Sequence, residues 1–207
     1  MNATELQKEM AMTYDKLTVY LQTKYGKPSR AYFRTTACKT KSPITRGDEG
    51  LFIHHIKETE VDNLQDPVQA LSAPWEYQEP DNLCYCNYLE HLILHIKINI
   101  MRSAQADALA FDGVINHIVP ELNYLYLDNP VETAKNRLWR NKVKDVIIDN
   151  YNEYQEILQL WVNAVKNYTW GNMLSVNKLL SWRGYSIPKP TLYEAINDFR
   201  KHCLRRG

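Results

Sequence analysis

The chain has 207 residues, 24% of them charged, and a net charge of only +1 at neutral pH. This length allows one or two domains with a proper hydrophobic core. The near-neutral balance excludes a general attraction to nucleic acid, so any such binding must come from local basic patches. The sequence contains neither a signal peptide nor an apolar run of membrane-spanning length, which favours a cytoplasmic protein without a membrane partner.

The first 46 residues predict a helix followed by a basic segment. Residues 3–24 carry apolar side chains near helical spacing. Residues 24–46 then mix lysines and arginines with aromatic side chains and contain no acidic residue. Such a mixture suits contact with phosphates and stacking on bases. The alternative interpretation of this segment is a solvated loop that carries lysines. The residues that we assign to nucleic-acid contact are Arg34, Lys39, Lys41 and Arg46.

A short strand is predicted to end at the adjacent histidines His54 and His55. The apolar run 51–53 follows Gly47 and Gly50, which are turn signals. Because successive side chains of a strand point to opposite faces, the two histidines cannot easily bind one ion together. The natural division is one metal ligand beside one base.

A second strand and a helix are predicted directly after residue 81. Residues 82–86 form the strand, with its two cysteines on one face as small core residues carrying reduced thiols. A helix then opens at residue 87 or 88 and runs towards residue 110. On this helix His91 and His95 are about 40° apart around the axis and share a face. Together with His54 they form an open three-ligand metal site.

These residues resemble the HNH nucleases of the ββα-metal (His-Me finger) superfamily. The similarity is to the DNase domains of the nuclease colicins and to phage and homing-endonuclease HNH modules. In that pattern a His-His pair ends the first strand and an Asn-hydrophobic step opens the second. A histidine follows nine positions after the asparagine, as His91 follows Asn82 here. The stretch from residue 56 to 81 is longer than in compact members and reads as an insertion loop.

The resemblance implies a role for each residue of the pattern. His54, His91 and His95 would bind one divalent cation (Mg²⁺, Mn²⁺, Ni²⁺ or Zn²⁺) against the scissile phosphate. His55 would deprotonate the attacking water, for which a pKa near neutrality is suited. Asn82 would tie the hairpin together by hydrogen bonds and so orient His55.

Three further acids and two further histidines are assigned no role in the metal site. Glu58, Asp62 and Glu90 are read as solvated surface acids rather than partners of the metal ligands. His117 and His202 are treated as ordinary histidines.

The remainder of the chain is predicted to be helical. Residues 131–168 form a long helix or a helical pair, with Pro130 at a helix start. Residues 176–199 could be two helices of helix-turn-helix type, with Arg200, Lys201 and Arg205 near phosphates. A plain helical interaction domain is the alternative.

The sequence therefore predicts an α+β protein in which a small ββα-metal HNH element is embedded in a mostly helical chain. Residues 1–45 form the N-terminal helix and basic segment, 46–104 the nuclease domain, and 105–207 a helical targeting or interaction domain. The expected function is metal-dependent cleavage of DNA by a phage or mobile-element protein in a bacterial host. The alternative is a binding protein on an HNH scaffold, such as an anti-CRISPR inhibitor, that contacts a protein partner through its helical C-terminal region.

Overall fold

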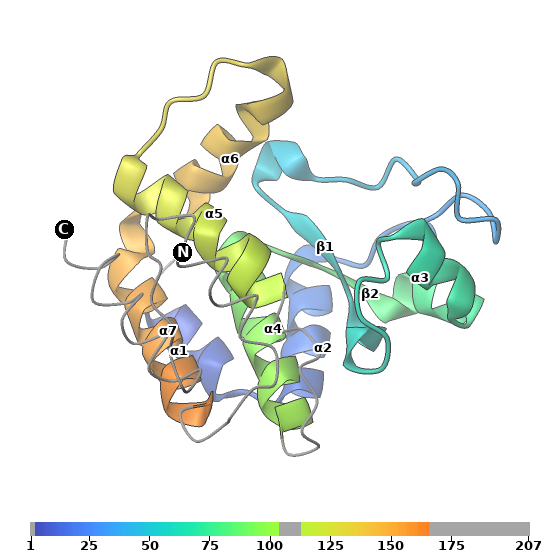
Figure 1. Ribbon diagram of the computed structural model, residues 1–207, viewed down its shortest axis with the longest axis horizontal. Coiled ribbons are helices and arrows are strands. Elements are labelled where there is room, and N and C mark those ends of the chain that lie inside the picture. The colour runs from blue at the N-terminus through green and yellow to red at the C-terminus, as the bar shows by residue number, and fades with distance from the viewer. Residues whose placement is uncertain (1–2, 104–112, 166–207) are drawn as a thin grey trace, which may run out of the picture.

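The computed structural model describes residues 3–103 and 113–165 (Figure 1). This part is mostly helical with one small sheet, which confirms the α+β class. Its α-helices are α1 (Ala3–Ala11), α2 (Tyr14–Tyr25), α3 (Pro67–Ser72), α4 (Tyr88–Ser103), α5 (Val119–Asn123), α6 (Leu138–Ile147) and α7 (Tyr151–Val165). The strands are β1 (Phe52–His55) and β2 (Leu83–Cys86). No helix in these ranges is both long enough and apolar enough to cross a membrane.

The sheet consists of β1 and β2, which pair antiparallel with His54 opposite Cys84. Both strands lie where the apolar runs predict them. A two-stranded sheet is marginal by itself, so it depends on packing against helices. Strand β2 is buried at every position, with α2 and α4 packed near it. Cys84 and Cys86 both enter the main core whereas Leu83 enters a second, smaller cluster, as strand alternation predicts.

Helix α4 begins with a reciprocal cap that fixes its direction after β2. The Asn87 side chain accepts hydrogen bonds from the backbone N–H groups of Leu89, at 2.9 Å, and Glu90, at 3.0 Å. The Glu90 carboxylate accepts in return from the backbone N–H of Asn87, at 2.7 Å. This is a capping-box arrangement, which satisfies backbone donors that a helix start leaves unpaired. The start of the helix is therefore fixed within one residue of the strand.

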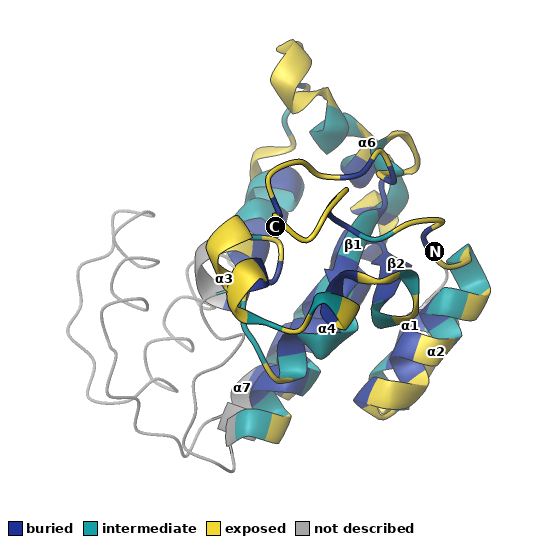
Figure 2. Ribbon diagram, turned by 90° about the vertical axis from the view of Figure 1, so that its right-hand side faces the viewer, coloured by how far each residue is buried: buried dark blue, intermediate teal, exposed yellow. Residues whose placement is uncertain are grey.

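Helix α4 also forms the centre of the main hydrophobic core. Its buried side chains pack with residues from α1, α2, β2, α5, α6 and α7 in one cluster. Figure 2 shows the buried residues concentrated along α4 and the strands, while α3 is largely exposed. A buried hydrogen bond from Trp161 to Asn99, at 2.9 Å, ties α7 to α4, and one from Tyr154 to Asn123, at 3.0 Å, ties α7 to α5. The two metal-ligand candidates of α4 therefore lie on the helix at the centre of the main hydrophobic core.

The N-terminal prediction of one helix over residues 3–24 is wrong in one respect. The chain forms two helices, α1 and α2, separated at residues 12 and 13. Thr13 adopts an extended backbone and its side chain accepts from the backbone N–H of Lys16 at 3.4 Å, so it caps α2. Threonine favours such N-cap positions, which explains the break within a continuous apolar pattern.

Within the range 131–168, the part up to residue 165 is described and contains the expected helical pair, α6 and α7, but Pro130 does not start it. Helical structure begins only at Lys135. The preceding segment is held in a non-helical conformation by Asn141 of α6, whose side chain bonds both the N–H and the carbonyl of Glu132, at 3.0 and 2.8 Å. Lys144 binds the carbonyl of Pro130 at 2.6 Å. Contacts with α6 therefore override the local helical signal.

The stretch between the strands is structured and not a simple insertion loop. Short 3₁₀ turns at Ile56–Thr59, Trp75–Gln78 and Pro80–Asn82 flank α3 within it. The extension of the His91 helix beyond residue 103, the segment 176–199 and the basic residues 200–206 lie outside the described residues.

A buried ionic cluster joins the N-terminal helices to α4. The Lys24 ammonium lies 2.7 Å from Glu5, 3.1 Å from Glu9 and 2.6 Å from Glu90. One cation thus faces three carboxyl groups, and Glu9 carries one buried oxygen without a hydrogen-bond partner in the described structure. Burial, followed by the charge of Glu90, raises the pKa of Glu9 to about 8. The folded protein therefore holds a proton on Glu9 at neutral pH.

This proton makes stability depend on pH. The pKa of Glu9 is about 8 in the folded state against an ordinary value of 4.5, so the folded state binds more protons between these values. The resulting stability is complete below pH 4.5 and is lost as the pH rises to 8. We expect the free energy of unfolding of wild type to fall relative to Glu9→Gln by roughly 1–2 kcal/mol between pH 5 and 8. This is less than the full shift, because Glu9 and Glu90 share the Lys24 ammonium and titrate together.

Urea denaturation of both proteins at pH 5, 6.5 and 8 measures this difference. Glu5→Gln is the matched control, because a hydrogen bond from Lys24 lowers the pKa of Glu5 below 4.5. Its carboxyl group is therefore ionised in both the folded and unfolded states over this range and should add almost no pH dependence. Parallel pH dependences for wild type and Glu9→Gln would contradict the assignment of the proton to Glu9.

Candidate metal centre

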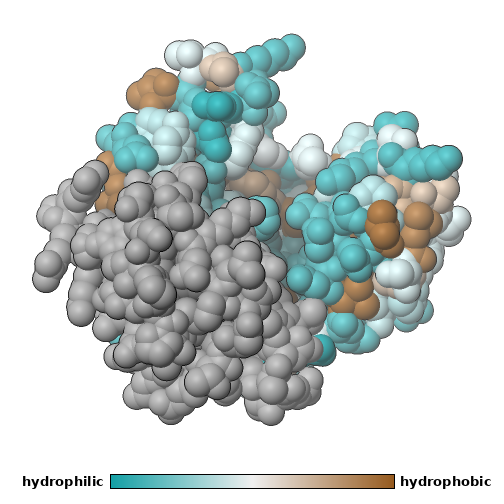
Figure 3. Space-filling model, viewed as in Figure 1, coloured by the Kyte–Doolittle hydropathy of each residue, from teal (hydrophilic) through white to brown (hydrophobic). Residues whose placement is uncertain are grey.

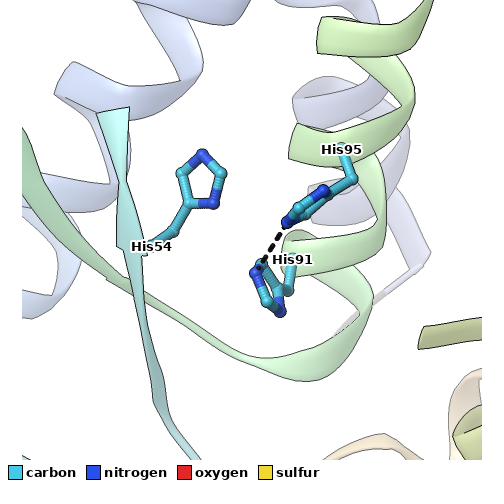
Figure 4. Close-up of side chains that lie close together, drawn as sticks. All are labelled: His54, His91 and His95. Atoms are coloured by element: carbon cyan, nitrogen blue, oxygen red, sulfur yellow. Dashed lines mark hydrogen bonds between the residues drawn. The ribbon is translucent and has the colours of Figure 1, made fainter. Parts of the chain in front are cut away.

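The structure brings together His54 of β1 with His91 and His95 of α4 (Figure 4). One ring nitrogen from each lies within 4.8 Å of the others. The Nε2 atoms of His91 and His95, one helical turn apart, are separated by 3.1 Å. Two ligands of one tetrahedral ion, each about 2.0–2.1 Å from it, lie roughly 3.3 Å apart. The spacing of these two nitrogens thus suits a shared metal ion.

The tautomer of His54 is set by a tyrosine of α2. The Tyr14 hydroxyl donates to the carbonyl oxygen of Ile56 at 2.8 Å. Its oxygen also lies 2.9 Å from Nε2 of His54, so it accepts from a protonated Nε2. Nδ1 of His54 then carries the lone pair, and this buried atom has no hydrogen-bond partner in the described structure. A second group that orients a ligand imidazole is typical of metal sites.

The three imidazoles are held neutral. Burial, followed by the neighbouring histidines, lowers the pKa values of His54 and His91 well below their ordinary range. Burial, with His117 nearby, lowers the pKa of His95 to about 4. Neutral imidazole is the form that binds a metal ion. In the described structure, each of the three rings also has a buried Nδ1 without a hydrogen-bond partner. Three uncharged nitrogen ligands fit a divalent transition metal better than Mg²⁺, which prefers oxygen.

His55 points to the other side of β1, as strand alternation predicts. Its Nε2 lies 3.1 Å from Oε1 of Gln78, while Nε2 of Gln78 donates to the carbonyl of Leu64 at 3.2 Å. The Gln78 oxygen therefore accepts from His55 Nε2–H, and Nδ1 of His55 carries the lone pair. Burial lowers the pKa of His55 to about 4, so the expected value near neutrality is wrong because the ring is removed from water.

A cavity of about 330 Å³ lies beside the histidines. His55, His91 and His95 line it, together with Glu58 and Asp62. The candidate base and the two metal-ligand candidates of α4 thus border the same space, which is large enough for a phosphate group and water. His117, which the sequence analysis treats as an ordinary histidine, also lines this cavity.

Asn82 does not act on His55 directly. It lies in the 3₁₀ turn before β2, and its amide donates to the carbonyl of Glu76 at 2.8 Å. Glu76 belongs to the turn Trp75–Gln78, which also carries the His55 partner Gln78. Asn82 is therefore connected to His55 through this turn, and Gln78 is the residue that sequence reasoning missed.

Glu58 is the second missed residue, and its interpretation as a surface acid is wrong. Its exposed fraction is 6%, and its Oε2 lies 3.6 Å from Nδ1 of His54 and 3.5 Å from Nε2 of His95. The 3₁₀ turn after β1 folds the chain back and places this side chain among the histidines. Glu90 is also fully buried, but it belongs to the cap of α4 and the Lys24 cluster. A carboxylate four residues after a ligand histidine is too weak a pattern to predict this contact.

The four basic residues assigned to nucleic-acid contact differ in their availability. Arg34, Lys39 and Lys41 are exposed, and the Lys41 ammonium lies 5.0 Å from the centre of the Tyr32 ring. Arg46 is half-buried and already engaged: its guanidinium binds Glu49 and donates to the carbonyl of Tyr25 at 2.6 Å. Arg46 therefore links the turn at Glu49 to the end of α2, a structural role that the basic pattern does not predict.

No protein-family model matches the chain, and comparisons with curated proteins and with solved structures found no significant match.

The geometry predicts one high-affinity site for a transition metal per chain. Calorimetric titration should give one Zn²⁺ or Ni²⁺ bound per chain, more tightly than Mg²⁺. His91→Ala should weaken Zn²⁺ binding by roughly 100-fold or more, because it removes one of three nitrogen donors. His55→Ala is the matched control and should keep the affinity, since its ring nitrogen faces Gln78. Wild-type affinity in both His91→Ala and His95→Ala would place the binding site elsewhere.

Proposed function

We propose that this protein is a metal-dependent HNH endonuclease that hydrolyses phosphodiester bonds of DNA. The observation that carries the proposal is the convergence of His54, His91 and His95 as neutral rings. Two of them, His91 and His95, line a cavity that His55 also lines. The order of the elements supports it, because two antiparallel strands are followed at once by the helix that supplies two of the ligands. Site geometry, and not the overall fold, is the basis of the argument.

Each residue of the site has a defined task in this reaction. His54, His91 and His95 would hold the ion, which when bound neutralises the charge that develops on the phosphate and on the leaving 3′-oxygen. His55 accepts a proton from a water molecule at Nδ1 as the water oxygen attacks phosphorus and the bond to the 3′-oxygen breaks. Gln78 holds the ring for this transfer. The negative phosphate raises the pKa of His55 above its value in the free protein, which improves the base.

Double-stranded DNA would reach the cavity along exposed surface near β1. Arg34, Lys39 and Lys41 are exposed cations of the basic segment and would contact phosphates. Such contacts carry little sequence information, so target choice would need additional surface from the helical part of the chain.

A binding function on the same scaffold is the second candidate. Helix α3 exposes two large apolar side chains three residues apart, Val68 at 71% and Leu71 at 59%. Figure 3 shows apolar surface among hydrophilic side chains on the side of the molecule that carries α3. Exposed apolar surface rimmed by polar groups is typical of protein–protein contacts. A partner such as a host defence complex, bound here or through the C-terminal region, would suit an anti-CRISPR inhibitor.

Plasmid cleavage tests the proposed function. Wild-type protein with Mg²⁺, Mn²⁺, Ni²⁺ or Zn²⁺ should nick or linearise supercoiled DNA, and EDTA should stop the reaction. His55→Ala should reduce cleavage by roughly 100-fold or more while retaining the fold and bound metal, because only the proton acceptor is lost. Arg34→Ala combined with Lys39→Ala should mainly weaken DNA binding at higher salt.

Cleavage that is undiminished in metal-loaded His55→Ala would exclude His55 as the base. No cleavage by wild type with any of these ions, on double- or single-stranded DNA, would favour the binding function.

A further inference from the structure

We propose that Glu58 is a fourth protein ligand of the metal ion, so that the resting centre is a closed site of three histidines and one carboxylate. A substrate phosphate would then have to displace this carboxylate. The inference rests on the metal centre of the proposed function and adds to it a residue from outside the HNH pattern.

The position of the Glu58 carboxylate is the first observation. Its Oε2 lies 3.6 Å from Nδ1 of His54 and 3.5 Å from Nε2 of His95. Both distances are too long for good hydrogen bonds. They are close to the separation of roughly 3.3 Å between ligands of a tetrahedral ion. The oxygen therefore stands at ligand spacing from two of the three imidazole nitrogens without binding either.

The surroundings of this carboxylate are the second observation. A buried carboxylate requires a cation or several hydrogen-bond donors to offset its desolvation. Among the described residues, the ion-pairing contacts of Glu58 are with His54 and His95, and both rings are neutral. The backbone N–H of Leu64 is a donor to it, while burial, followed by the charge of Asp62, raises the pKa of Glu58 to about 8. A divalent cation between this carboxyl group and the imidazoles would take the place of its proton and offset the burial of the charge.

The local fold explains how the ligand is delivered. Strand β1 ends at His55 and passes directly into the turn Ile56–Thr59, which returns Glu58 to the side of His54. The hydroxyl of Tyr14 binds both ends of this connection, the His54 ring and the carbonyl of Ile56. One tyrosine of α2 therefore positions the histidine ligand and the turn that carries the carboxylate.

The closed site has a chemical consequence. Zinc sites with four protein ligands are structural, whereas catalytic sites keep one position open for water or substrate. Release of the Glu58 carboxylate would create that open position. The adjoining cavity of about 330 Å³ is lined by Glu58 itself, so the displaced group has space beside the ion. Glu58 would thus restrain cleavage until a phosphate competes for the metal.

Metal affinity and the visible spectrum of bound Co²⁺ test this role. Glu58→Gln keeps the shape of the side chain but replaces a charged oxygen donor by a weak neutral one. It should lower Zn²⁺ affinity by roughly 10–100-fold and change the Co²⁺ absorption bands, because the ligand set changes. Asp62→Asn is the matched control, because Asp62 is an acid that lines the same cavity. It should leave the Co²⁺ bands unchanged and alter Zn²⁺ affinity much less than Glu58→Gln, because its charge acts on Glu58 without supplying a ligand. Thermal unfolding of the metal-free variants checks the fold, and Glu58→Asp, which withdraws the oxygen by one methylene, replaces Glu58→Gln if that variant does not fold.

Inorganic phosphate tests the displacement. Phosphate should perturb the Co²⁺ spectrum of Glu58→Gln at a lower concentration than that of wild type, since no charged ligand has to leave. Wild-type affinity and spectrum in Glu58→Gln, with both lost in His91→Ala, would overturn the role of Glu58 and leave the metal centre intact. Unchanged binding in Glu58→Gln and His91→Ala together would overturn the centre itself.

Discussion

The burial of three uncharged imidazoles between β1 and α4 is the constraint on which the candidate site depends. Imidazole in water readily takes a proton near neutral pH, but burial holds His54, His91 and His95 in the neutral form. A buried neutral ring offers a lone pair, and the buried Nδ1 of His54 has no hydrogen-bond partner in the described structure. Such an atom is costly unless something binds it. A metal ion would convert this cost into a stabilising contact.

The fold supports this burial from three directions. The capping box of Asn87 and Glu90 fixes where α4 starts relative to β2. The hydroxyl of Tyr14, on α2, is hydrogen-bonded to Nε2 of the His54 ring. The turns between the strands close the remaining side with Gln78 and Glu58. The segment that reads as an insertion therefore completes the surroundings of both histidines of the adjacent pair.

The spacing of the histidines was sufficient to predict which of them meet. Strand alternation separates His54 from His55, and a single helical turn aligns His91 with His95, so local periodicity decides both relations. Glu58 and Gln78 could not be predicted, because their contacts depend on the path of 3₁₀ turns that carry no periodic signal. The low pKa of His55 was missed for a related reason, since burial is a property of tertiary packing. The break at Thr13 is the opposite case: its capping preference is visible in the sequence but was outweighed by the apolar pattern around it.

The state of the imidazole nitrogens offers the most direct measurement of the central claim. Long-range ¹H–¹⁵N NMR of the histidine side chains distinguishes protonated, lone-pair and metal-bound nitrogens in each ring. On titration with Zn²⁺, metal-bound signals are expected at Nδ1 of His54 and at Nε2 of His91 and His95, with His55 unchanged. Unchanged signals from His91 and His95 at one equivalent of Zn²⁺, or metal-bound signals from His55 in place of His54, would contradict the account.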